Sequence, residues 1–166
     1  MNKLPQRSSY RLQKFDYTTP GYYFVTICVQ NRLECFGKVK NDLVVLDEQG
    51  IIAEKFWKEV PNHYPNVGLD VFVVMPNHIH GIVIIKQLPA DGRPYKQVSL
   101  SKIIGSYKNV VSKAIRNINS NFEWQHSFYD HVIRSQEDLT RIREYIVNNP
   151  KQWELDEYNQ KFAIIK

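Results

Sequence analysis

The stretch LDVFVVMPNHIHGIVIIK, residues 69–86, holds two β-branched apolar runs on either side of a Pro-Asn pair. Short apolar runs separated by Pro, Asn and Gly are typical of neighbouring antiparallel strands. If His78 and His80 lie on the second strand, alternation points both imidazoles to one face of the sheet and Ile79 to the other. Two such imidazoles could share a divalent cation, and at such a site we expect them to face solvent. The alternative is one surface histidine and one half-buried, hydrogen-bonded histidine.

Composition predicts one soluble globular domain over residues 1–166. Hydrophobic residues make up 43% of the chain and charged residues 23%, and this length can bury a core. The net charge of +5 favours an anionic partner such as nucleic acid, although many small proteins are this basic for other reasons. Two cysteines are too few for a disulfide framework, and no apolar stretch approaches membrane-spanning length. We therefore expect a cytoplasmic protein without membrane contact.

The other hydrophobic patterns predict the order strand, helix, strand, strand, helix, strand, helix. The two further strands are expected at 22–30 and 128–134, and the three helices at 47–60, 99–118 and 135–149. Residues 42–46 fit a short strand or a turn. This order predicts an α+β fold in which an antiparallel sheet carries helices mainly on one face, as in ferredoxin-like and RRM-like folds. Such a sheet leaves its other face open to a ligand.

The last predicted helix carries two residues that could complete a metal site. Tyr145 and Asn149 are four residues apart, so they are neighbours on one face, at the edge of the apolar stripe. From there a tyrosine could reach a metal held by the sheet. Two imidazoles and an amide oxygen would leave positions open for phosphate oxygens and would accept Mg²⁺ or Mn²⁺, with Mn²⁺ the better match to nitrogen. The alternative is a packing tyrosine and an asparagine that ends the helix before Pro150.

Other histidine sites fit the sequence less well. Histidine-triad hydrolases need a third alternating histidine, but Ile82 stands where that histidine would be. Two-histidine phosphoesterases need a second His-x-Ser/Thr element, which His126, Ser127 and His131 do not supply. We expect His131, beside Asp130, to be a hydrogen-bonded structural residue, with a place beside the site as the alternative.

Several blocks in this order resemble one known family. Residues 74–81 resemble the His-hydrophobic-His metal motif of the HUH single-tyrosine transposases. Residues 22–32 resemble their first strand, and 124–134 with 145–150 resemble their C-terminal signature. More narrowly, the chain is similar to the REP-associated tyrosine transposases, relatives of the small insertion-sequence transposases. The likeness covers about residues 7–153 and implies an HUH fold.

The resemblance also implies roles for individual residues. Tyr145 would attack a DNA phosphate, giving a 5′-phosphotyrosine link and a free 3′-OH. His78 and His80 would bind the divalent ion, and Asn149 would stand where the insertion-sequence enzymes use a glutamine as third ligand. The substrate would be single-stranded DNA near an imperfect hairpin, and the family includes both monomers and homodimers.

Basic residues are candidates for contacts with the DNA backbone. They lie in the basic arm over residues 1–14 and on the predicted helix 99–118: Arg7, Arg11, Lys14, Lys102 and Lys108. Residues 151–166 form a C-terminal tail that we expect to add a turn and a short strand. Two other functions stay open: a hairpin DNA- or RNA-binding module that no longer cuts, and a metal-dependent phosphodiesterase that uses water.

Overall fold

The computed structural model describes residues 15–159. The basic arm with Arg7, Arg11 and Lys14 lies outside the described residues, and so does the end of the tail, where a strand was expected. The described start of the tail forms a 3₁₀ helix, η3 (Asn149–Leu155).

A four-stranded antiparallel sheet forms the centre of the molecule, with the strand order β4-β5-β1-β6. Its strands are β1 (Gly21–Cys28), β4 (Val67–Met75), β5 (His78–Ile85) and β6 (Tyr129–Ile133). The expected antiparallel sheet is confirmed. Strands β4 and β5 are the two apolar runs of residues 69–86, and β5 is a central strand, paired on both sides.

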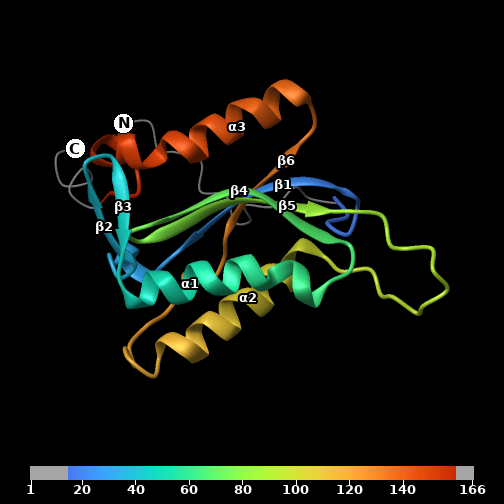
Figure 1. Ribbon diagram of the computed structural model, residues 1–166, viewed down its shortest axis with the longest axis horizontal. Helices are drawn as coiled ribbons and strands as arrows, with labels where there is room; N and C mark the ends of the chain where they lie inside the picture. The colour runs from blue at the N-terminus through green and yellow to red at the C-terminus, as the bar shows by residue number, and fades with distance from the viewer. Residues whose placement is uncertain (1–14, 160–166) are drawn as a thin grey trace, which may run out of the picture.

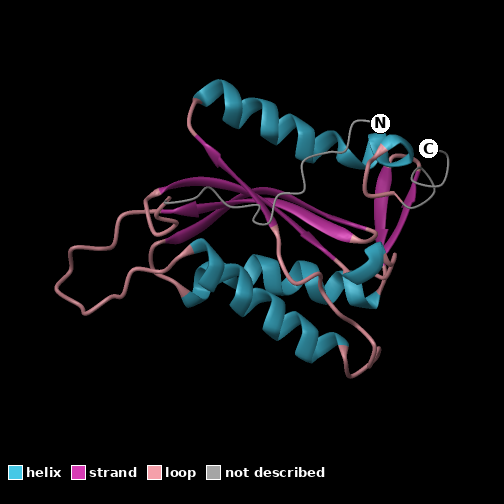
Figure 2. Cartoon of the chain, turned by 180° about the vertical axis from the view of Figure 1, so that it is seen from behind, coloured by secondary structure: helices cyan, strands magenta, loops and turns pink. Residues whose placement is uncertain are grey.

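Three α-helices cover the sheet, and two of them lie on one face (Figure 1). They are α1 (Glu48–Glu59), α2 (Leu100–Ile115) and α3 (Gln136–Asn148). The N-cap side chains of Asp47, Ser99 and Ser135 each accept a hydrogen bond from a backbone N–H of the first turn. Helices α1 and α2 lie below the sheet, and α3 lies alone above it, as the reverse view also shows (Figure 2).

The second face of the sheet is therefore not open, which corrects one expectation. Leu139, Ile142 and Ile146 of α3 pack against Phe24 and Ile82 of the sheet. The apolar stripe of α3 needs a surface to cover, and this face supplies apolar side chains next to the histidines. What remains accessible is a cavity at the edge of this contact, rather than a free sheet surface.

A separate two-stranded sheet was predicted only in part. It is formed by β2 (Gly37–Lys40) and β3 (Leu43–Leu46), and only β3 overlaps the predicted strand or turn. The turn residues Asn41 and Asp42 both have positive φ, 49° and 60°, as in a type I′ hairpin turn. Lysines alternate with small or apolar residues in β2, so its apolar signal is weak. Among the described residues, no helix combines the length and the apolar character needed to cross a membrane.

Candidate active site

The turn between β4 and β5 is fixed by its neighbours. The backbone N–H groups of Cys35 and Phe36 both donate to the Pro76 carbonyl at 3.0 Å. The Asn77 carbonyl accepts from Val29 N–H at 2.9 Å. The start of β5, where the histidines lie, is thus held in place by the chain that follows β1.

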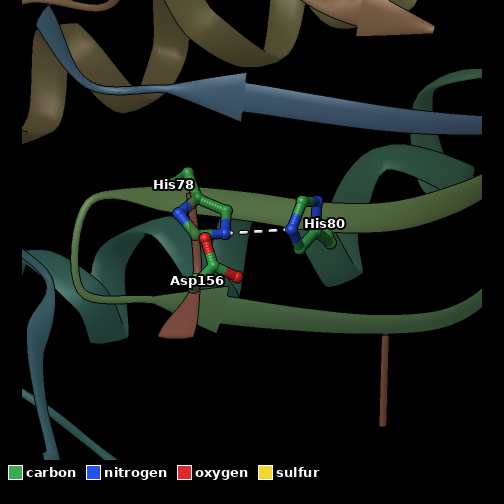
Figure 3. Close-up of side chains that lie close together, drawn as sticks. All are labelled: His78, His80 and Asp156. Atoms are coloured by element: carbon green, nitrogen blue, oxygen red, sulfur yellow. Dashed lines mark hydrogen bonds between the residues drawn. The ribbon is translucent and has the colours of Figure 1, made fainter. Parts of the chain in front are cut away.

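His78 and His80 point to the same face of β5, and their Nε2 atoms lie 3.0 Å apart (Figure 3). Their exposed fractions are 0% and 1%, so the expectation that they face solvent was wrong. The physical reason is the cover on this face: the ring of Tyr145 lies 5.1 Å from that of His80, and the ring of Tyr158 lies 4.6 Å from that of His78.

Burial keeps both imidazoles neutral at ordinary pH. Desolvation lowers the pKa of His80 from 6.5 to about 3. The pKa of His78 is lowered well below 6.5, first by burial and then by the charges of His80 and Arg32. A neutral imidazole has a free lone pair, which is the form that binds a metal ion.

Each imidazole is also held through its other ring nitrogen. Nδ1 of His78 lies 2.8 Å from the Asn77 Oδ1, and Nδ1 of His80 lies 2.8 Å from the Thr26 Oγ1. Thr26 is directly opposite His80 in the pairing of β1 with β5. These contacts orient the two Nε2 atoms toward one another.

Tyr145 of α3 lies beside this pair. Its hydroxyl is 3.2 Å from the Nε2 of His80, and the side chain is 39% exposed. The pKa of Tyr145 is raised, first by burial and then by the negative charges of Asp156 and Glu157. Because α3 is anchored on Phe24 and Ile82, its stripe edge faces the histidines.

Asn149 is buried at the end of α3, close to Asp156. Its Nδ2 donates to the Asp156 Oδ2 at 2.9 Å, while its Oδ1 is buried and has no hydrogen-bond partner among the described residues. An unpaired buried carbonyl oxygen is costly and is the kind of atom that a cation could satisfy. Asn149 is thus one hydrogen bond away from Asp156, and its amide oxygen is the kind of donor predicted as third ligand.

Asp156 is a residue that the sequence did not single out. Its carboxylate lies with the two imidazoles, and one ligand atom from each of the three falls within 4.8 Å of the others. Burial raises the pKa of this carboxyl. Two nitrogens and one carboxylate are donors that suit a divalent cation, so His78, His80 and Asp156 could hold one. No periodic pattern marks Asp156, because it follows a short 3₁₀ helix in the tail.

A cavity of about 780 Å³ opens beside His80 and Tyr145. Its walls combine aromatic rings with basic groups, among them Tyr129, Arg32 and Arg141. Aromatic faces can stack on bases, and guanidinium groups can pair with phosphates. The cavity is thus chemically suited to a nucleotide strand.

His131 lines the same cavity while making a structural contact. Its Nε2 lies 2.7 Å from the Asp138 Oδ2, and Asp138 also pairs with Arg141. This hydrogen bond from His131 is the largest cause of the lowered pKa of Asp138. Both sequence-based interpretations of His131, as a hydrogen-bonded residue and as a neighbour of the site, describe its position.

Neither of the two candidate lysines of α2 lines the cavity, although Lys108 contacts two residues that do, Gln125 and Ser127. The Lys108 ammonium donates to the carbonyls of Gln125, His126 and Ser127, at 2.6, 3.2 and 3.4 Å. Lys102 is exposed, but its helix covers the opposite face of the sheet (Figure 1). The basic groups that line the cavity are Arg32 and Arg141, neither of which the sequence analysis named as a DNA contact.

Comparison with known proteins gives two relatives from Haemophilus influenzae. One is an uncharacterized protein, 36% identical over 165 residues, covering 91% of this chain and 92% of the relative. The other has a name that places it provisionally among the REP-associated tyrosine transposases. It is 27% identical over 142 residues, covering 81% of this chain and 73% of the relative. No model of a known protein family matches the chain.

Two solved structures share the fold. One is a REP-associated tyrosine transposase bound to a REP hairpin, with a TM-score of 0.63 and 23% identity over 90% of this chain and 76% of that one. The other is a provisionally named transposase from Deinococcus radiodurans, with a TM-score of 0.50 and 14% identity over 83% of this chain and 97% of that one. The fold is accordingly the HUH fold. In sequence and in fold, the chain is thus similar to proteins named as REP-associated tyrosine transposases.

Proposed function

We propose that this protein is a cytoplasmic, metal-dependent endonuclease and strand transferase that acts on hairpin-forming single-stranded DNA through a covalent link to Tyr145. The observation that carries the proposal is the 3.2 Å contact between the Tyr145 hydroxyl and the Nε2 of His80, beside the Nε2 of His78. The proposed nucleophile and one imidazole of the pair, His80, thus meet at the wall of one cavity.

In this proposal His78 and His80, together with Asn149 or Asp156, hold Mg²⁺ or Mn²⁺. The bound ion would polarise a phosphate oxygen and offset the charge that builds up in the transition state. The chain's own contribution is a buried, neutral and oriented donor set. The unpaired Oδ1 of Asn149 and the close carboxylate of Asp156 support such a set.

Tyr145 would attack the phosphorus of one phosphodiester. The phenol oxygen forms a bond to phosphorus and gives up its proton, and the bond from phosphorus to the 3′ oxygen breaks. The 3′ oxygen takes up a proton, so the products are a 5′-phosphotyrosine and a free 3′-OH. Burial raises the pKa of this phenol, so the free protein keeps the nucleophile protonated.

The DNA substrate is proposed from the family and from the cavity. The related solved structure is named as bound to a REP hairpin. Here Arg32 and Arg141 offer charge for phosphates, and Tyr129 and Phe24 offer ring faces in the same cavity. Phosphate contacts by the basic arm and by Lys102 remain part of the proposal, as additional positioning contacts outside the cavity.

The test is formation of a covalent adduct. A 3′-labelled hairpin oligonucleotide from a repeat near the gene is incubated with protein and Mn²⁺ and separated under denaturing conditions. We expect a protein-linked label with the native chain and with Tyr129→Phe, a matched tyrosine of the same cavity, and none with Tyr145→Phe. DNA binding by Tyr145→Phe should stay within about threefold, because only one hydroxyl is lost.

Two outcomes would contradict the proposal. Cleavage that survives Tyr145→Phe would indicate a phosphodiesterase that uses water. Tight hairpin binding by the native chain without adduct or cleavage, over a panel of repeats and with either metal, would indicate a binding module.

A further inference from the structure

The Asn77 side chain fixes the protonation of one imidazole. Its Nδ2 lies 3.0 Å from the Arg32 carbonyl oxygen and 2.8 Å from the Tyr158 carbonyl oxygen. Both partners are acceptors, so the amide nitrogen must point at them, and Oδ1 must face His78. An amide oxygen only accepts, so the His78 Nδ1 at 2.8 Å carries the hydrogen. The Nε2 of His78 is then a bare lone pair.

The partner of the second imidazole has a different character. The Thr26 hydroxyl, 2.8 Å from the Nδ1 of His80, can either donate or accept a hydrogen bond. Thr26 is 2% exposed and His80 is 1% exposed, so water does not compete for this contact. The His80 ring can therefore carry its single hydrogen on either nitrogen without losing the bond to Thr26.

The 3.0 Å contact between the two Nε2 atoms then requires a particular arrangement. Because His78 presents a lone pair, the contact is a hydrogen bond only when His80 carries its hydrogen on Nε2. A cation shared by the pair imposes the opposite demand, because both Nε2 atoms must then present lone pairs.

We propose that Asn77 fixes the tautomer of His78, whereas Thr26 acts as a switch that lets the tautomer of His80 change when a metal ion binds. Without metal, His80 donates from Nε2 to the Nε2 of His78, and Thr26 donates to the Nδ1 of His80. With metal, the His80 hydrogen lies on Nδ1 and is donated to Thr26, whose hydroxyl now accepts. The ring gains and loses no proton overall, so a buried neutral pair becomes a bidentate donor without charging either ring. The proposal rests on the metal site of the proposed function, and both residues are positioning residues.

The direct test reads the ring nitrogens of the full chain by ¹H–¹⁵N nuclear magnetic resonance. Histidine-labelled protein is studied with a chelator and then with diamagnetic Zn²⁺ as the probe. We expect His78 to carry its hydrogen on Nδ1 in both states and His80 to change from Nε2–H to Nδ1–H. The exposed His63 and His126 serve as internal controls. The proposal is overturned if His80 already carries Nδ1–H without metal, or if His78 carries Nε2–H.

A second test uses matched variants of Thr26. Thr26→Val keeps the shape and loses the hydroxyl, whereas Thr26→Ser keeps the hydroxyl. Calorimetric titration with Mn²⁺ should show affinity lower by about 10–100-fold for Thr26→Val and near the native value for Thr26→Ser. Native affinity in a folded Thr26→Val variant would overturn the switch. If that variant does not fold, the resonance experiment still decides, because it uses the native chain.

Neither test depends on DNA cleavage. A hydrogen shift on His80 without any DNA adduct would leave the switch standing and remove the proposed function. A DNA adduct with the native chain, but no hydrogen shift on His80, would support the proposed function and remove the switch.

Discussion

The two faces of strand β5 differ in what holds them together. Ile79 and Val83 point into the large core between the sheet and the helices α1 and α2, and both are fully buried. His78 and His80 point to the other face and are just as buried, but their ring nitrogens are held by hydrogen bonds to polar side chains. One strand therefore serves as core on one side and as the base of the candidate site on the other.

The two faces of β5 also differ in how tightly they are packed. On the apolar face, which packs against α1, a Cβ on Gly81 would lie 2.6 Å from the Cζ2 of Trp57. This face therefore has no spare room. On the other face, a cavity opens beside His80 and Tyr145. Close packing gives the strand a fixed position, and the fixed strand then presents two oriented imidazoles to the open side.

The largest effect on stability is expected on the apolar face. Ile79→Ala should lower the free energy of unfolding by about 2–5 kcal/mol, because it removes fully buried methyl groups and leaves a cavity. Urea denaturation measures this loss. Mn²⁺ affinity of the folded variant should stay near the native value. A large loss of metal affinity would show that the two faces are not separable.

For His80, we expect the larger effect on metal affinity and the smaller effect on the free energy of unfolding. His80→Ala should abolish metal binding, and it should also cost about 1–3 kcal/mol, because the hydroxyls of Thr26 and Tyr145 lose a hydrogen-bond partner. Calorimetry with Mn²⁺ and urea denaturation with a chelator give the two values. An unchanged unfolding energy would mean that this contact is replaced by water.

A further contrast should appear on acidification. The folded pKa of His80, about 3, lies below the ordinary 6.5, so the unfolded chain binds more protons between these values. Stability of the metal-free protein should therefore fall as the pH drops below about 6.5, by up to about 1.4 kcal/mol per pH unit for each such imidazole. His80→Gln should make this slope shallower, because it removes the titrating imidazole. Constant stability from neutral pH to about pH 5 would contradict the burial argument.

The smallest effect concerns the rim of the cavity. Arg141→Gln removes one exposed cation from the cavity wall, so hairpin DNA binding should weaken modestly. The slope of log affinity against log salt should become shallower by about 0.7–0.9, as expected for one phosphate contact. Fluorescence anisotropy over a salt series measures it. A Lys102→Gln variant on the opposite face reports whether α2 contributes at all.

The regular part of the fold could be predicted from local sequence. Residues 69–86 carry strong β-branched runs, and Asp47, Ser99 and Ser135 mark the three helix starts, because these signals act within a few residues. Alternation along β5 placed both imidazoles on one face for the same reason. The resemblance to the REP-associated tyrosine transposases was confirmed by the relatives and the shared fold.

The remaining features depend on contacts between distant segments. Burial of His78 and His80 follows from how α3 and the chain around Tyr158 settle on the sheet, which no short window of sequence contains. Asp156 reaches the site from an irregular segment. Lys108 carries a charge that suits DNA, yet its ammonium is taken up by three carbonyls that only the folded chain assembles.

In the proposed reaction the phenol of Tyr145, and no other tyrosine near the imidazole pair, attacks the DNA. Tyr158 is the main alternative nucleophile, because the centroid of its ring lies 4.6 Å from that of His78. Tryptic digestion of the purified adduct with tandem mass spectrometry separates them, since they fall in different peptides. We expect a nucleotide joined through its 5′ phosphate to Tyr145, in the peptide of residues 144–151. The same modification on Tyr158, or on Tyr129, would contradict it.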